Sequence, residues 1–353
     1  MGNLFQDYSS LYVIDNYHKI EIFFPLYTKN TIYQAIKMTE FIEKVVFMDT
    51  DVKQLCSKQD LVLSLKLEAE EGWERKEGDE DIDVIAALDG HGKPIVPKTL
   101  ATFDFNEHFM KTDPIESIQC LLDEKVKHEV RTKGILINAQ SLASGSTISF
   151  AKIYRNKVTK KVVVKLEWMG DSPIMVFLNG ELVFESQLHC AANDDEIATL
   201  KGRGVPIVLE HSATGVNVLA ENMIESKAGK YFIYAGTHST AVTRSLGHNR
   251  RLGLFESQKH VIECSTDDDL KVIVMSDGVG DMLKKHIDME KFKTFTATEL
   301  VDLAEKRWKQ EWTVRTSTGK TVQYSFPSNG YDDCCAAVWW QRDPIIEDAS
   351  SNV

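Results

Sequence analysis

The chain has 353 residues, of which 43% are hydrophobic and 27% are charged, proportions ordinary for a globular protein with a core of its own. Its formal net charge of −12 argues against nucleic acid or an anionic membrane as the main partner. The six cysteines form no CxxC pair, no secretory signal precedes them, and no apolar stretch is long enough to span a membrane. These features predict an intracellular protein, in the cytoplasm or nucleus.

The N-terminal segment, residues 1–52, is the hardest to interpret. We expect it to add opening strands and a helix at residues 30–44 to the same domain as the chain that follows. Met1-Gly2 begins like a myristoylation signal, but Gln6 stands where Ser or Thr is expected, so acylation is not predicted. The acidic run at 68–83 is predicted to be a solvated hairpin tip or loop.

Two apolar runs, residues 83–88 and 270–275, each stop abruptly at an Asp followed by Gly. The first ends at Asp89-Gly90 and the second at Ser276-Asp277-Gly278. A buried strand that ends this way brings a carboxylate to the sheet rim, where Gly allows a close backbone approach. Taken singly, such an end is usually only a turn. Taken together, the two could place several hard oxygen ligands around one Mg²⁺ or Mn²⁺ site.

The remaining elements are predicted from periodicity and turn chemistry. Helices are expected at about residues 97–111, from Asp113-Pro114 onward, and after Thr296, which has capping-box spacing to Glu299. Strands at 174–178 and 182–184 flank Asn179-Gly180, a strong hairpin signal. Further strands are expected at 162–168, 230–235, 272–275 and 336–340. Residues 193–229 are interpreted as an irregular insert, and residues 343–353 as a polar tail. This order favours α+β layering with antiparallel sheets.

Six short motifs follow one another in order: Asp89-Gly90-His91-Gly92, Ser144-Gly145-Ser146-Thr147, Met169-Gly170-Asp171-Ser172, the run at residues 241–247, Ser276-Asp277-Gly278 with Asp281, and Asp332-Asp333. From about residue 59 to residue 341 the chain resembles the protein phosphatase 2C family of metal-dependent Ser/Thr phosphatases. The resemblance implies one catalytic domain, residues 53–342. It also implies two antiparallel β-sheets in a central sandwich flanked by helix pairs, which is an α-β-β-α order of layers.

The resemblance also implies a site with two Mn²⁺ or Mg²⁺ ions. Asp89 would bridge both ions, and Gly90 would add its carbonyl oxygen. The other implied positions are Asp277 and Asp333 as direct ligands, Asp60 as a contact through water, and Asp171 and Asp281 as holders of a third, weaker ion. Of the adjacent pair, Asp333 is favoured over Asp332 by its distance from the strand at 336–340. A water between the metals would attack phosphorus in phosphoserine or phosphothreonine, and His91 would protonate the leaving oxygen.

Four positions depart from the family pattern. Leu55 stands where an Arg usually grips phosphate, which leaves Lys53 and Lys58 as the nearest phosphate-binding candidates. Lys93, His248 and Cys334 replace a Gly, an Asp and an Asn. Residues 248–251 are interpreted as a solvated turn rather than a nucleic-acid site. Two functions therefore remain open: an active phosphoprotein phosphatase, monomeric by default, or a pseudophosphatase that binds phosphoproteins or acts in an assembly.

Overall fold

The computed structural model describes residues 9–15, 18–24, 50–55, 59–67, 82–133, 140–235, 238–315 and 319–341. The chain forms two compact units, Met1–Met48 and Asp49–Val353. In the first, β1 (Ser9–Asp15) pairs antiparallel with β2 (His18–Phe24). The helix expected at 30–44 and most of the acidic run, residues 68–81, lie outside the described residues. The assignment of residues 1–52 to the catalytic domain stays a prediction.

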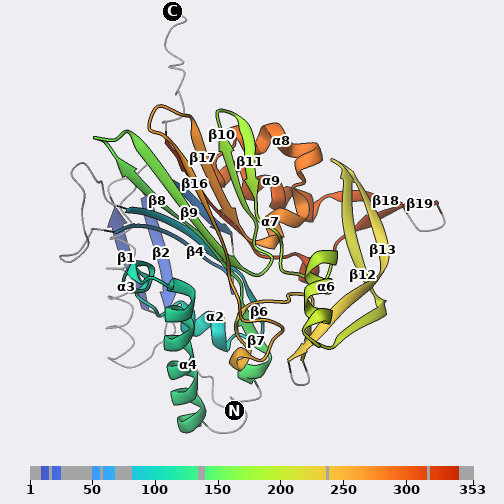
Figure 1. The fold of residues 1–353 in the computed structure, drawn as a ribbon. Coiled ribbons are helices and arrows are strands. Elements are labelled where there is room, and N and C mark those ends of the chain that lie inside the picture. The colour runs from blue at the N-terminus through green and yellow to red at the C-terminus, as the bar shows by residue number, and fades with distance from the viewer. Residues whose placement is uncertain are drawn as a thin grey trace, which may run out of the picture. The chain divides into compact units, whose positions relative to one another are not determined.

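Two five-stranded sheets make up the centre of the second unit (Figure 1). All neighbouring strands in both sheets run antiparallel. The first sheet has the order β16 (Gln258–Ser265), β9 (Lys161–Met169), β8 (Ile148–Asn156), β5 (Ile82–Leu88) and β4 (Leu61–Leu67). The second has the order β11 (Glu181–Glu185), β10 (Ile174–Leu178), β17 (Leu270–Met275), β20 (Cys334–Trp340) and β3 (Thr50–Leu55).

The alternation of side chains along β5 and β20 explains how these sheets are covered on both faces. On β5, Ile85 and Ala87 pack into the core between the sheets, whereas Val84, Ala86 and Leu88 pack beneath helices. On β20, Cys335, Ala337 and Trp339 face the shared core, and Cys334, Ala336 and Val338 face the opposite way. Because successive side chains point to opposite faces of a sheet, a strand that is apolar throughout must be covered twice. The predicted α-β-β-α layering is confirmed.

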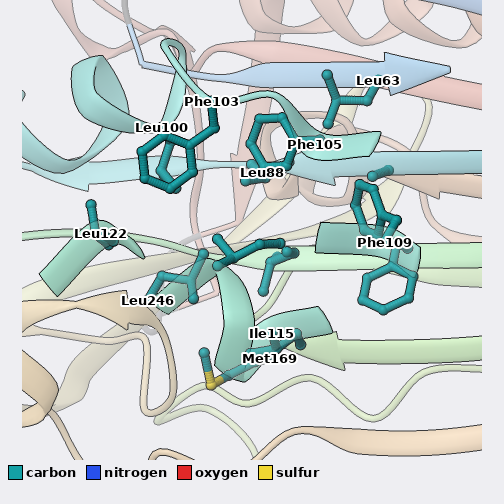
Figure 2. Packing of buried hydrophobic residues seen from close by; sticks show 14 of the residues in the cluster. Leu63, Leu88, Leu100, Phe103, Phe105, Phe109, Ile115, Leu122, Met169 and Leu246 are labelled. Atoms are coloured by element: carbon teal, nitrogen blue, oxygen red, sulfur yellow. The ribbon is translucent and has the colours of Figure 1, made fainter. Parts of the chain in front are cut away.

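Helices α2 (Ile95–Leu100), α3 (Phe105–Met110) and α4 (Pro114–Lys133) cover the first sheet. Figure 2 shows their aromatic and aliphatic side chains packed with Leu88 of β5 and Met169 of β9. The single helix expected at 97–111 is wrong, since the chain breaks between α2 and α3. Asp104 causes a new start there: its Oδ1 accepts a hydrogen bond from the Asn106 amide at 3.1 Å, which satisfies a free donor of the first turn.

The second sheet is covered by α7 (Asp277–Met282), α8 (Lys285–Thr294) and α9 (Ala297–Lys309). The expected capping box is present. The Glu299 amide donates to Thr296 Oγ1 at 3.2 Å, and the Thr296 amide donates to Glu299 Oε2 at 2.8 Å. None of the helices in the described ranges is both long and apolar enough to cross a bilayer.

Thr296→Ala should lower the free energy of unfolding by about 1 kcal/mol, because the first turn of α9 loses its side-chain acceptor. Thr296→Ser keeps the hydroxyl and is the matched control. Chemical denaturation of the three proteins checks this, and equal midpoints for the Ala and Ser variants would contradict it.

The expected hairpin at Asn179-Gly180 is confirmed, with φ of +52° and +79° at the two turn residues joining β10 to β11. The irregular insert expected at 193–229 is wrong. It contains α6 (Asp194–Gly202), β12 (Ile207–Ala220) and the start of β13 (Met223–Ala235). These long strands pair through main-chain hydrogen bonds, which a mixed sequence supports as well as an apolar one. Together with β18 (Glu311–Arg315), β19 (Thr321–Ser325) and β14 (His238–Thr240) they form a further sheet.

Asp83, expected at the end of the acidic loop, lies inside the structure instead. It belongs to β5 and is 7% exposed. Its Oδ2 accepts hydrogen bonds from Trp339 Nε1 at 2.9 Å and Arg155 Nη2 at 3.1 Å. This carboxylate ties the two sheets together because Arg155 and Trp339 belong to different sheets.

A small sheet at the end of β5 completes the frame. It contains β6 (Gly90–Gly92), β7 (Ser144–Ser146) and β15 (Leu246–Gly247), in the order β15-β7-β6. The 3₁₀ turn η1 (His248–Arg250) follows β15 directly, and a second 3₁₀ turn, η2 (Ser328–Gly330), precedes β20.

Candidate metal centre

The two acidic strand ends meet in space. Asp89 follows β5 in the first sheet, and Asp277 opens α7 after β17 in the second sheet. Burial raises the pKa of Asp89 well above its ordinary value, and the charges of Asp277 and Asp60 raise it further. Carboxylates act on one another in this way only at short range. The two sequence-distant strand ends therefore place their carboxylates close enough to interact, and a shared metal site stays a prediction.

The glycine after each of these Asp residues packs against another candidate segment. A Cβ placed on Gly90 would lie 2.5 Å from the Gln59 carbonyl oxygen, next to Asp60. A Cβ on Gly278 would lie 2.0 Å from the Asp333 carbonyl oxygen. Glycine is required at both positions because any side chain would separate the segments. Each Asp-Gly pair thus brings a second acidic residue to the site.

Asp60 and Asp332 belong to the same electrostatic group. Burial, together with the charge of Asp333, raises the pKa of Asp60 to about 7. Asp332 as a whole residue is exposed, but its carboxyl group is partly buried. This burial and the charge of Asp277 raise the pKa of Asp332 to about 7. Asp332 thus acts electrostatically on this group alongside Asp333, the residue that the sequence favours as the ligand.

The other candidate site residues lie on separate segments of the chain. Asp171 follows Gly170, which has a φ of +121° and packs against Thr147 after β9. Asp281 lies on α7, is exposed, and is 3.5 Å from Lys284 Nζ; its charge also acts on Asp332. Lys53 lies on β3, in register with Ala336 of β20. Lys58 lies outside the described residues.

The donor set suits a hard divalent cation, although the side chains do not form a ready-made cage. Within the described ranges, no group of three or more His, Cys, Asp and Glu side chains is placed to hold a metal ion. The carboxylates of Asp60, Asp89 and Asp332 nevertheless all have raised pKa values, with acidic neighbours among the causes. A divalent cation would relieve this repulsion, and carboxylate oxygens are the ligands that Mg²⁺ and Mn²⁺ prefer.

Thr147 holds the backbone of Asp89 in place. The Asp89 amide donates to Thr147 Oγ1 at 3.0 Å, and the Thr147 amide donates to the Asp89 carbonyl at 2.8 Å. Thr147 Oγ1 also lies 2.6 Å from Ser172 Oγ. The sequence places Thr147 in one of the six motifs but does not indicate this contact. Its place directly before β8, the neighbour of β5, is the signal that could have revealed this contact.

His91 makes a contact that sequence reasoning missed. Its Nε2 lies 2.9 Å from Nε2 of His248, with ring centroids 5.1 Å apart and an interplanar angle of 22°. His248 was expected in a solvated turn, but it is fully buried. The turn is present, but its first side chain points inward because β15 runs beside β7 in the small sheet. The replacement of the family's usual Asp by His248 was the available signal.

No protein-family model matches the sequence, and no curated protein matches it significantly. Among solved structures, a Caenorhabditis elegans sex-determining protein is 16% identical with a TM-score of 0.50, over 89% of this chain and 72% of that one. A Streptococcus agalactiae serine/threonine phosphatase is 17% identical with a TM-score of 0.46, over 83% of this chain and 99% of that one. The catalytic domain of the phosphatase PstP, in complex with two manganese ions, is 13% identical with a TM-score of 0.39, over 82% and 97%. Serine/threonine phosphatases that cover most of the chain are thus among its structural neighbours. The sequence identities are low, so the likeness to the sex-determining protein shows a shared fold alone.

Proposed function

We propose that the chain is a metal-dependent phosphoprotein phosphatase that hydrolyses phosphoserine and phosphothreonine. The observation that supports this most is the meeting of Asp89 and Asp277, which come from the ends of strands in two different sheets. The six motifs that resemble the phosphatase 2C family supply these same residues. The substrate class follows from that resemblance, and the solved serine/threonine phosphatases with similar structures agree with it.

In this proposal Asp89, the Gly90 carbonyl, Asp277 and Asp333 hold two Mn²⁺ or Mg²⁺ ions. Asp60 acts through water, and Asp171 and Asp281 serve a third, weaker ion. When bound, such ions supply an acidified water and neutralise charge on phosphoryl oxygens. Thr147 fixes the backbone of Asp89 and so sets the direction of its carboxylate. His91 protonates the departing Ser or Thr oxygen. Lys53 and Lys58 are the proposed phosphate contacts in place of the missing Arg.

Metal removal tests the proposal directly. Hydrolysis of a phosphothreonine peptide should require added Mn²⁺ or Mg²⁺, fall to background in excess chelator, and return when metal is restored. Phosphate release measures it, with the unfolding temperature in chelator as the check that the chain is still folded. Turnover that persists in chelator would sink the proposal.

The second candidate is a phosphoprotein-binding pseudophosphatase. It is favoured by Leu55, which is in register with Cys334 of β20 at the position where the family usually has an Arg that grips phosphate. Losing a bidentate contact should weaken phosphate capture more than it affects the metal-binding carboxylates. Calorimetry would decide: Mn²⁺ binding and phosphopeptide binding without any phosphate release would establish this alternative.

A further inference from the structure

We propose that His248 is a positioning residue for His91, holding its ring through an Nε2–Nε2 hydrogen bond and fixing which ring nitrogen carries the proton. The inference rests on the proposed function in one respect: the ring that His248 positions is the one proposed to protonate the leaving oxygen. The hydrogen bond itself, 2.9 Å long, can be tested without any activity.

The small sheet explains how two histidines 157 residues apart come together. On β7, Gly145 is in register with His91 of β6 on one side and with Gly247 of β15 on the other. His248 is the next residue after β15. Gly145 has no side chain, so both rings occupy the space above it. A Cβ there would lie 2.2 Å from His248 Nε2 and 2.5 Å from His91 Nε2.

Hydrogen bonds to α4 anchor the chain on both sides of His248, at Gly247 and at Arg250. The Gly247 amide donates to Oε1 of Gln119, a fully buried residue of α4, at 2.9 Å. Two residues after His248, Arg250 donates to Glu116 Oε1 at 2.8 Å and to Asp123 Oδ2 at 2.8 Å, both also on α4.

The backbone from His248 to Arg250 is left-handed, with φ values of +49°, +51° and +58°. Non-glycine residues rarely adopt this conformation, and it persists only where the surroundings enforce it. Because the buried ring is held by a strained backbone with anchors at both ends, we infer that its direction is set before substrate arrives.

The partners of His248 determine the positions of the protons. Its Nδ1 lies 2.7 Å from the Leu142 carbonyl oxygen, which can only accept, so Nδ1 carries a hydrogen. In a neutral His248 ring, Nε2 is then the acceptor. The hydrogen between the two rings therefore belongs to Nε2 of His91.

This arrangement has a consequence for the proposed reaction. The hydrogen on His91 Nε2 is directed at His248, so His91 donates as the imidazolium, with hydrogens on both ring nitrogens, and the proton given to the leaving oxygen comes from Nδ1. The Nδ1–H bond breaks, the new O–H bond forms, and His91 is left neutral with Nε2–H still bonded to His248.

Nuclear magnetic resonance of the full chain, labelled with ¹⁵N histidine and loaded with Mg²⁺, tests the arrangement. In the neutral rings we expect the hydrogen on Nδ1 of His248 and on Nε2 of His91, as the partners of the two rings require. We also expect a scalar coupling between their two Nε2 atoms. Single substitutions assign the signals. A His248 ring protonated on Nε2, or His91 signals unchanged in His248→Ala, would overturn the inference.

Kinetics provides the second measurement. His248→Ala should lower kcat by about 10- to 100-fold with KM nearly unchanged, because loss of a positioning partner affects proton donation rather than binding. His248→Gln can still offer an oxygen to His91 Nε2–H and should recover part of the loss. His286→Ala removes an exposed histidine on α8 and is the matched control, expected to match the unaltered chain.

The outcomes separate the two proposals. If the unaltered chain shows the Nε2–Nε2 coupling but no turnover, the phosphatase proposal fails and the histidine pair stands. If it turns over phosphopeptide without the coupling, or if His248→Ala is fully active while folded, the histidine inference fails alone. Thermal unfolding of each variant distinguishes loss of function from loss of fold.

Discussion

Asp89→Asn is expected to lower metal-dependent phosphopeptide hydrolysis by about 1000-fold, because a metal site without this proposed ligand would lose several kcal/mol of transition-state stabilisation. The same change should make the metal-free protein more stable. The Asp89 carboxyl group is buried beside Asp277 and Asp60, and the amide removes a charge that the fold disfavours. A gain in stability with a loss of activity is the trade-off expected where a functional site is destabilised by its own charges.

The measurement is a pair of unfolding temperatures, in chelator and in excess Mn²⁺, taken beside the kinetics. The unaltered chain should gain stability from Mn²⁺, whereas Asp89→Asn should be more stable in chelator and gain little. Asp113→Asn is the control, since Asp113 is exposed, pairs with Lys259 and has no part in the proposed site. A variant that is destabilised in chelator would contradict the electrostatic account of this site.

Asp277→Ala should reproduce the loss of activity from the opposite sheet. Asp277 is the first residue of α7 and acts electrostatically on Asp89 and Asp332. If Asp89→Asn were inactive while Asp277→Ala retained turnover, the two strand ends would not share one site, and the function proposed here would be wrong.

The individual strands and helices were predictable because their signals are local, whereas the α-β-β-α order of the layers was implied by the family resemblance. β20 is apolar at every position and β5 at every position except Asp83, so both strands need cover on both faces. The Asn179-Gly180 turn and the Thr296 capping box each depend on residues a few positions apart. The break between α2 and α3 was missed because Asp104 was not recognised as a new helix start.

What the sequence could not show depends on contacts between distant segments. The pairing of β12 with β13 relies on main-chain hydrogen bonds, which leave no periodicity in a sequence of mixed polarity. The burial of His248 depends on Gly145 lying between two strands of the small sheet. In the same way, Asp332 and Asp60 could be recognised as acidic, but the influence of Asp332 on the pKa of Asp60 appears only when Gly278 and Gly90 bring the segments together.

Arg307→Ala is expected to destabilise the protein by about 3–5 kcal/mol, the usual loss when one partner of a buried ion pair is removed. Arg307 and Asp288 have side chains 3% and 0% exposed. Arg307 Nη1 donates to Asp288 Oδ2 at 2.6 Å, Nη2 donates to Oδ1 at 2.8 Å, and Nη1 also donates to the Met282 carbonyl. Burial would raise the pKa of Asp288, but hydrogen bonds from Arg307 and Lys291 outweigh it and lower the pKa.

Denaturant unfolding measures the loss, with Lys306→Ala as an exposed control on the same helix that should change stability by less than about 0.5 kcal/mol. The double variant Asp288→Leu with Arg307→Met should be more stable than Arg307→Ala, because no unpaired charge stays buried. A double variant less stable than Arg307→Ala would show that the loss of stability comes mainly from the lost geometry of the pair rather than from the burial of a lone charge.

This ion pair also bears on the metal centre. Arg307 bonds the last residue of α7, and its neighbour Trp308 donates Nε1–H to the Gly278 carbonyl at 2.9 Å, one residue after Asp277. Helix α9 therefore holds both ends of the short helix that presents Asp277. Folded Arg307→Ala should consequently bind Mn²⁺ more weakly than Lys306→Ala does. Unaltered affinity in the folded variant would mean that the Trp308 hydrogen bond alone is sufficient to hold Asp277 in place.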